Sequence, residues 1–256
     1  MIQELAQLLK SSIEECLEDR ISISFSGGID SSLIAHIAKE HCEVDLFSAG
    51  TESAQDLQYA KEVAKQLGLN YSEKLLDKDS ILELYKEIYK IIPGSLIHLG
   101  ILLPIYACAK EAKNQGHDTM LVGSGSEELF VGYNRYYTYL KEGKDLDSIL
   151  KEEFRTLPKR DVGMVSKILR AVGLEPRFPF MNGKLAKFLF SIPLEKRMED
   201  EELKKGLLRD AAKILNLPEL PRTRKKKAAQ YGSGVHKILL KNSDFLNKEY
   251  PPKFTY

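Results

Sequence analysis

The sequence predicts an α/β fold, in which helices cover both faces of a parallel sheet and an all-helical C-terminal extension follows. Over the first 140 residues, short apolar runs alternate with segments of helical periodicity. Three of the apolar runs end at glycine, at Gly27, Gly50 and Gly123. Parallel strands need crossover helices of this kind, and their carboxyl ends meet along one edge of the sheet. We therefore expect residues 1–140 to form an α/β core and residues 141–256 a helical extension, packed as one compact unit.

Each element follows from its periodicity and its end signals. An amphipathic helix opens the chain, and the first strand runs from Ile21 into Ser26-Gly27-Gly28. Ser31 is an N-cap residue type and opens the next helix. The other expected elements are strands at 44–48, 71–76 and 119–122, and helices at 56–67, 80–89, 96–113 and 201–215.

Composition and charge exclude several classes of protein. With 256 residues, of which 43% are apolar and 29% charged, the chain has the composition of an ordinary globular protein. A net charge of +1 provides no whole-chain attraction to nucleic acid or membranes, and no apolar run reaches the ~20 residues of a membrane span. The three cysteines, Cys16, Cys42 and Cys108, form no CxxC pair that would indicate zinc or a disulfide framework. We expect a cytoplasmic protein without a membrane partner.

The most informative segment is residues 21–32, ISISFSGGIDSS. Paired glycines after a strand permit a tight turn with exposed N–H groups, and the helix that follows adds the positive end of its dipole. Ser26 and Ser31 add hydroxyl donors, and Asp30 offers the carboxylate that Mg²⁺ needs beside phosphate oxygens. The segment is neither a Walker loop nor a GxGxxG dinucleotide loop. It predicts a phosphate-binding turn of another kind, with a plain capped turn as the alternative.

A second strand-to-helix turn, at residues 121–133, has the same physical plan. In LVGSGSEELFVGY, Ser126 is a cap and Glu127 and Glu128 occupy the first helical turn. Carboxylates often lie there only because they complement the helix dipole. The alternative is that one of them shares a Mg²⁺ ion with Asp30.

Four motifs in order resemble the synthetase domain of the asparagine synthetase family. SGGIDS at 26–31 is similar to the pyrophosphate-binding motif of the PP-loop ATP pyrophosphatases, and 121–133 resembles the family's LSGEGSDELFGGY. GLEPRFPFMN at 173–182 is similar to GxEARxPFLD, and 222–234 resembles the C-terminal R-x-K…G segment. The resemblance implies a PP-loop core (adenine nucleotide alpha hydrolase-like), ATP and Mg²⁺ as cofactors, and a small carboxylate and an amine or ammonia as substrates.

The resemblance also implies roles for residues at matching positions. The pyrophosphate would be held by Ser26, Gly27, Gly28, Asp30 and Ser31, and the adenosine by Phe25, Ala49, Val122 and Gly123. Asp30 and Glu127 match the two carboxylates that bind Mg²⁺.

Two further matches concern catalysis. Lys226 falls on the lysine of R-x-K, which faces the phosphates, although three consecutive lysines leave the register open by one residue, and a solvated charge run is the alternative. Glu175 is a candidate for the base that takes a proton from the attacking amine, with a structural ion pair to Arg177 as the alternative. Lys205 and Arg209 match a K-x-x-x-R helix, for which we predict a structural or phosphate-facing role.

Three departures from the family pattern bear on the reaction. The chain begins Met1-Ile2, without the cysteine nucleophile of a glutaminase domain, so we expect ammonia, another amine or a separate glutaminase partner to supply nitrogen. Ser124 replaces a glutamate near the reacting centre, which weakens the expectation of amination by ammonia. Residues 92–100, IPGSLIHLG, replace the polar E-T-x-D…R, which suggests an acceptor other than aspartate. His98 in that segment is expected to be a core residue.

The sequence thus predicts an AMP-forming ligase, in which a carboxylate attacks the α-phosphorus of ATP and an amine then displaces AMP. A PP-loop RNA-modifying enzyme is a second hypothesis, because basic residues at 222–227 and Lys159-Arg160 leave a nucleic-acid substrate open. A nucleotide-binding protein without ligase chemistry is the third, because of Ser124. An oligomer is compatible with all three.

Overall fold

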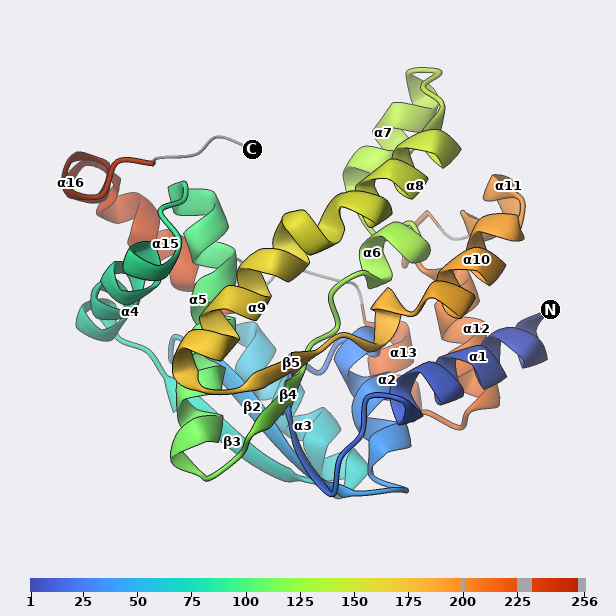
Figure 1. Ribbon diagram of the computed structural model, residues 1–256, viewed down its shortest axis with the longest axis horizontal. Helices are drawn as coiled ribbons and strands as arrows, with labels where there is room; N and C mark the ends of the chain where they lie inside the picture. The colour runs from blue at the N-terminus through green and yellow to red at the C-terminus, as the bar shows by residue number, and fades with distance from the viewer. Residues whose placement is uncertain (199–200, 225–231, 253–256) are drawn as a thin grey trace.

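A five-stranded parallel sheet forms the centre of the protein. The computed structural model describes residues 1–198, 201–224 and 232–252 (Figure 1). The strands lie in the order β3-β2-β1-β4-β5, and every neighbouring pair is parallel. They are β1 (Arg20–Ser24), β2 (Glu43–Gly50), β3 (Asn70–Leu75), β4 (Thr119–Leu121) and β5 (Glu175–Arg177). The α/β class with a parallel sheet, expected from the sequence, is confirmed.

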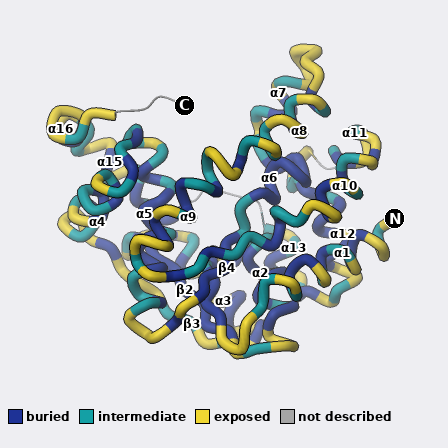
Figure 2. Tube along the Cα trace, in the orientation of Figure 1, coloured by how far each residue is buried: buried dark blue, intermediate teal, exposed yellow. Residues whose placement is uncertain are grey.

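Helices cover both faces of the sheet because successive strand residues point to opposite sides. On β4, Leu121 belongs to one hydrophobic cluster and Met120 to the other. The first cluster is built with α1 (Ile2–Glu14), α2 (Ile29–Ala38), α3 (Gln55–Leu67), α10 (Gly183–Ser191) and α12 (Gly206–Ile214). The second is built with α4 (Lys78–Ile91), α5 (Leu96–Asn114), α9 (Asp161–Val172) and α15 (Val235–Lys241). The inner strands β1, β2 and β4 are accordingly buried along most of their length, whereas the edge strand β3 is mostly exposed and the edge strand β5 is only partly buried (Figure 2).

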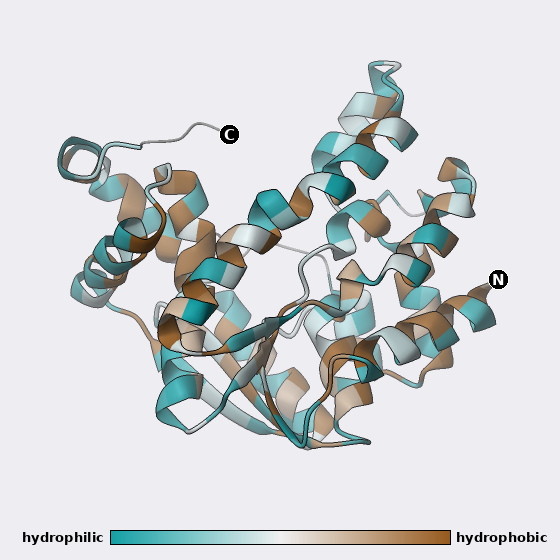
Figure 3. Cartoon of the chain, in the orientation of Figure 1, coloured by the Kyte–Doolittle hydropathy of each residue, from teal (hydrophilic) through white to brown (hydrophobic). Residues whose placement is uncertain are grey.

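Six further helices complete the described part of the chain. They are α6 (Ser126–Leu129), α7 (Asn134–Lys141), α8 (Leu146–Thr156), α11 (Leu194–Arg197), α13 (Glu219–Thr223) and α16 (Ser243–Glu249), with short 3-10 turns at Leu157–Lys159 and Pro179–Met181. The pair α7 and α8 rises away from the sheet (Figure 1) around a small apolar cluster that includes Tyr136 and Leu150. Apolar segments of most helices face inward, and hydrophilic segments face outward (Figure 3).

No single helix in the described part of the chain is both long and apolar enough to cross a membrane. The helices α4 and α5 meet that criterion only as a pair, and a 107° bend separates them.

Two elements differ from the sequence-based expectation. Residues beyond 140 were expected to be helical only, but Glu175–Arg177 adds β5 to the edge of the sheet. The helix expected at 201–215 begins only at Gly206, because Lys204 and Lys205 have φ angles of 58° and 57° in the left-handed region. Such angles cannot continue a right-handed helix, so Lys205 becomes the residue that precedes α12.

Candidate active site

The turn between β1 and α2 has the geometry expected of a phosphate-binding loop. Gly27 has a φ of 67°, and a Cβ atom there would lie 2.9 Å from the Cα atom of Ala60 on α3. Both the left-handed angle and the close approach of α3 therefore require glycine. Gly28 is the N-cap of α2, so the positive end of the helix dipole faces this turn.

The loop's own hydroxyls satisfy its N–H donors only weakly. The Ser26 amide donates to Ser31 Oγ over 3.3 Å, and the Gly28 amide donates to Ser26 Oγ over 3.3 Å. The Ser31 hydroxyl in turn donates to the Gly28 carbonyl over 3.3 Å. These distances are longer than the ~2.9 Å of a good hydrogen bond. Phosphate oxygens could therefore replace the hydroxyls as acceptors at little cost.

The second glycine turn, between β4 and α6, packs directly on the first. A Cβ atom at Gly123 would lie 3.2 Å from the Cβ atom of Asp30 on α2, so the two turns touch. Gly125 has a φ of 97° and precedes the short helix that carries Glu127. The Glu127 side chain is buried, and that of Asp30 is largely buried. The sequence left open whether Glu127 or Glu128 reaches Asp30, and the structure brings Glu127 there.

Lys205 joins these two carboxylates. Its Nζ donates to Asp30 Oδ1 at 2.7 Å, to Asp30 Oδ2 at 2.8 Å and to Glu127 Oε1 at 2.7 Å. It also donates to Ser126 Oγ at 2.9 Å, and its side chain is only 2% exposed. Burial lowers the pKa of this lysine below its ordinary value, and the carboxylate of Asp30 opposes that effect.

This arrangement fits a Mg²⁺ site shared with phosphate. Oxygens from Asp30, Ser126 and Glu127 converge on one cation, the Lys205 ammonium. Hard cations such as Mg²⁺ prefer oxygen ligands of this type. No group of three or more His, Cys, Asp or Glu side chains suited to a metal occurs within residues 1–198, 201–224 and 232–252. The remaining ligands would therefore come from phosphate and water, as is usual for nucleotide-bound Mg²⁺.

Arg209 holds the backbone that presents Lys205. Its guanidinium donates to the carbonyls of Leu203 and Lys204 at 2.8 Å each, and also to those of Arg222 and Arg224. These bonds fix the two left-handed residues Lys204 and Lys205, which are otherwise unfavourable. The predicted structural role of Arg209 agrees with these contacts, whereas Lys205 lies in the site itself.

Arg224, at the end of α13, bonds directly to the phosphate-binding turn. Its NH1 donates to the Ser26 carbonyl at 2.7 Å, its NH2 pairs with Asp56 at the start of α3, and its guanidinium lies 4.0 Å from the ring centroid of Tyr59. Sequence reasoning did not single out this residue. Lys226, the predicted catalytic lysine, lies outside the described residues.

The strand ends beside the two turns contain the residues predicted to line an adenosine pocket. Phe25, Ala49 and Val122 are buried where β1, β2 and β4 end, and Gly123 adjoins Asp30. The C-terminal part of the chain also contacts this edge of the sheet. The Thr51 amide, just after β2, donates a hydrogen bond to the Ser233 carbonyl at 2.8 Å. The predicted pyrophosphate, adenosine and metal residues therefore all lie along the carboxyl edge of the sheet.

Glu175 is not brought to this group. It pairs in register with Thr119, the first residue of β4, whereas the site follows the last residue of that strand. Its carboxylate binds Arg170 at 3.2 Å and Arg177 at 3.4 Å, and these arginines lower its pKa. The structural ion pair, which the sequence left as the alternative, fits these contacts. Because β5 runs parallel to β4, its first residue lies at the amino edge of the sheet, away from the two glycine turns.

Glu128 and His98 each make contacts within the protein that account for their positions. Burial raises the pKa of Glu128 to about 7, and its backbone carbonyl accepts a bond from the buried Arg197. In the 92–100 segment, Ser95 caps α5, and its Oγ lies 2.8 Å from His98 Nδ1. Ile92 and Leu99 from the same segment belong to the hydrophobic core.

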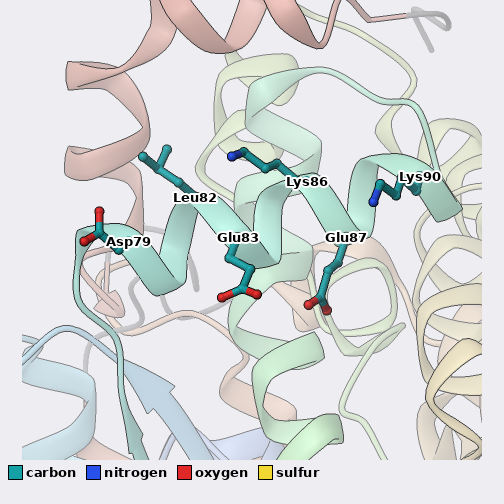
Figure 4. Close-up of a pocket in the computed structure, with 6 residues that line it drawn as sticks. All are labelled: Asp79, Leu82, Glu83, Lys86, Glu87 and Lys90. Atoms are coloured by element: carbon teal, nitrogen blue, oxygen red, sulfur yellow. The ribbon is translucent and has the colours of Figure 1, made fainter.

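A hollow on the protein surface lies elsewhere and contains none of these residues. All six residues that line it belong to α4: Asp79, Leu82, Glu83, Lys86, Glu87 and Lys90 (Figure 4). Glu87 accepts bonds from Lys110 at 2.8 and 3.0 Å, and the other charged side chains are two acids, Asp79 and Glu83, and two lysines, Lys86 and Lys90, on the same helix. This is the pattern of a solvated helix face, so we assign it no binding role.

Comparison with known proteins identifies the family to which the chain belongs. The sequence matches the asparagine synthase family in two overlapping segments, residues 4–166 and 139–248. It is 32% identical over 273 aligned residues to a putative glutamine-hydrolysing asparagine synthetase from Methanocaldococcus jannaschii, covering 93% of this chain and 50% of that protein. It is 27% identical over 251 residues to glutamine-hydrolysing asparagine synthetase B from Escherichia coli, covering 91% of this chain and 45% of that protein.

Among solved structures, the chain resembles NMN synthetase from Francisella tularensis, with a TM-score of 0.48 and 14% identity over 100% of this chain and 95% of that one. The chain spans about half the length of the curated relatives it matches.

Proposed function

The chain belongs to the asparagine synthase family, and we propose that it is an ATP-dependent ligase that forms AMP and pyrophosphate while it adenylates a substrate carboxylate. One observation carries this proposal. The SGGIDS turn, both predicted metal carboxylates and a buried lysine meet at the carboxyl edge of the sheet, between β1 and β4. Ligands of open α/β sheets bind at this edge.

We assign the following roles to residues of the chain. The amides of Ser26 and Gly28 and the start of α2 hold the pyrophosphate part of ATP. Asp30 and Glu127 would hold Mg²⁺, which would supply positive charge beside the phosphates. Lysine ammonium groups would add to that stabilisation, Lys205 from the position just before α12 and Lys226 from the basic segment.

We further propose that the acceptor carboxylate is not aspartate. The family carries acidic and basic side chains in the segment that corresponds to residues 92–100. Here the segment contains Ser95 and His98, whose side chains contact each other, and Ile92 and Leu99, which pack in the hydrophobic core. This segment provides few charged partners for a dicarboxylic substrate. The nitrogen would come from ammonia, another amine or a separate glutaminase.

The test is product analysis with α-labelled ATP, a panel of carboxylates and ammonium or primary amines. The proposal requires labelled AMP that appears only with Mg²⁺ and a suitable carboxylate. Labelled ADP as the sole product would refute it. AMP released with RNA but with none of the carboxylates would instead favour the RNA-modifying hypothesis, and tight nucleotide binding without turnover would indicate a binding protein.

A further inference from the structure

The ammonium of Lys205 occupies the position that the two proposed metal ligands define. Three of its four bonds, at 2.7 to 2.8 Å, go to carboxylate oxygens of Asp30 and Glu127. One ammonium and one metal ion cannot both lie at the same point between these carboxylates. A metal ion that enters must therefore displace Lys205.

Displacing Lys205 is unfavourable unless the ammonium finds another anion. The side chain is 2% exposed, so a displaced charge does not simply move into water. A buried, unpaired ammonium is far more costly than a paired one. A free divalent ion carries no anion to offer to this lysine, whereas a nucleotide brings several phosphate oxygens. Metal alone and metal with nucleotide should therefore bind very differently.

We propose that the Lys205 ammonium occupies the metal site in the free protein and leaves it only when the nucleotide binds. Metal and triphosphate then bind as one unit, and the ammonium transfers from the carboxylates to phosphate oxygens. The lysine offsets part of the negative charge of the two carboxylates in the free protein and prevents metal from binding without ATP. This inference rests on the proposed function, because it requires Asp30 and Glu127 to be metal ligands.

The geometry allows such a transfer through the side chain alone. Arg209 fixes the backbone carbonyls at Leu203 and Lys204, so the main chain beside Lys205 is held in place. The ammonium is carried on a flexible four-carbon stem with rotatable donors. Asp30 lies two positions after Gly28, whose amide belongs to the phosphate-binding turn. Phosphates held by that turn lie beside the carboxylate that Lys205 would leave.

The experiment measures Mn²⁺ binding by electron paramagnetic resonance, with and without an ATP analogue that has a methylene group between the α- and β-phosphorus atoms. The wild type is expected to bind Mn²⁺ weakly alone and on the order of 10- to 100-fold more tightly with the analogue. Lys205→Met is expected to bind Mn²⁺ alone on the order of 10-fold or more tightly than the wild type. The matched control is Lys110→Met, which removes an ammonium paired with Glu87 on α4, and should leave Mn²⁺ binding unchanged.

Lys205→Arg tests the inference even if the methionine variant does not fold. It keeps the positive charge and should exclude free Mn²⁺ as the wild type does. Wild-type protein that binds Mn²⁺ without nucleotide as tightly as with it overturns the inference, and if AMP formation persists the proposed function stands. Absence of Mn²⁺ binding in every variant, even with the analogue, removes the metal site and both proposals with it.

Discussion

Both ends of the sheet bury carboxylates, but they hold them in different ways. At the amino ends of the strands, Asp45 is contacted by Arg20 NH2 at 2.9 Å, Asn70 Nδ2 at 3.0 Å and His117 Nε2 at 3.0 Å. One carboxylate there has three partners on three different segments. At the carboxyl ends, Asp30 and Glu127 share a single ammonium group.

The backbones at the two ends differ as well. Around Asp45 the strands pair in regular parallel register with both neighbours. The left-handed residues near the partners of Asp45 are the glycines Gly68 and Gly116, whereas the opposite end contains the non-glycine left-handed residues Val131, Lys204 and Lys205. Unfavourable backbone angles of this kind cost of order 1–3 kcal/mol each and concentrate at functional sites.

This difference separates a stabilising network from one that can exchange its partners. Several short-range donors around one carboxylate leave no position for a ligand to enter. Two carboxylates that share one long, flexible side chain can release it for another cation. The following variants test whether the two ends are in fact specialised in this way.

The largest effect is expected from Asp30→Ala. Loss of one of the two carboxylates should weaken binding of a Mg²⁺–ATP analogue by about 100-fold or more, because metal and phosphates are held together. Titration calorimetry measures this affinity, and circular dichroism verifies the fold. A variant with full nucleotide affinity would refute the metal role of Asp30.

Asp45→Asn should have the opposite profile. It removes a buried carboxylate from Arg20, Asn70 and His117 and should lower the free energy of unfolding by about 2–4 kcal/mol. Nucleotide affinity should change less than twofold, since Asp45 lies at the other end of β2. Urea unfolding and calorimetry measure the two quantities, and a large loss of affinity would contradict the division between the ends.

Two glycines with nearly equal φ angles offer a matched comparison. Gly27 and Gly68 have φ values of 67° and 66°, but only a Cβ at Gly27 would meet the backbone of Ala60. Each alanine variant should lose about 1 kcal/mol of stability from its left-handed angle. Gly27→Ala should in addition weaken nucleotide binding by on the order of 10-fold as the turn shifts. Equal nucleotide affinities in the two variants would show that the turn does not hold phosphate.

The smallest effect is a pH dependence. Burial alone would raise the pKa of Asp45, but the bonds from Asn70 and Arg20 outweigh it, so its pKa lies below the ordinary value. Its contribution to stability is complete above the unfolded pKa of about 3.9 and is lost as the pH falls through the lowered folded value. The stability difference between wild type and Asp45→Asn should therefore be constant from pH 7 to about pH 5 and shrink by about 1 kcal/mol near pH 3. A difference that grows on acidification would contradict this assignment.

Local patterns predicted most of the fold. The strand and helix positions up to Leu121 follow from short-range periodicity and from glycine and serine end signals, and the structure differs from them by a few residues at the ends. Left-handed angles at Lys204 and Lys205 were not predictable, because Arg209, which bonds the nearby carbonyls of Leu203 and Lys204, is itself positioned by the more distant carbonyls of Arg222 and Arg224. The edge strand at Glu175–Arg177 is too short for any periodicity to reveal.

The sequence by itself determined the two glycine turns and the parallel sheet whose edge brings them together, because each depends on neighbouring residues and on the rules of strand connection. It also put acids at both turns, Asp30 at one and Glu127 and Glu128 at the other, but the local pattern left open which of the last two reaches Asp30. Only the tertiary structure decided that Lys205 lies between Asp30 and Glu127. It also decided that Glu175 lies at the far edge. The first contact joins residues 175 positions apart, and the second depends on strand register. Such placements follow from how whole helices and strands pack, about which a short stretch of sequence carries no information.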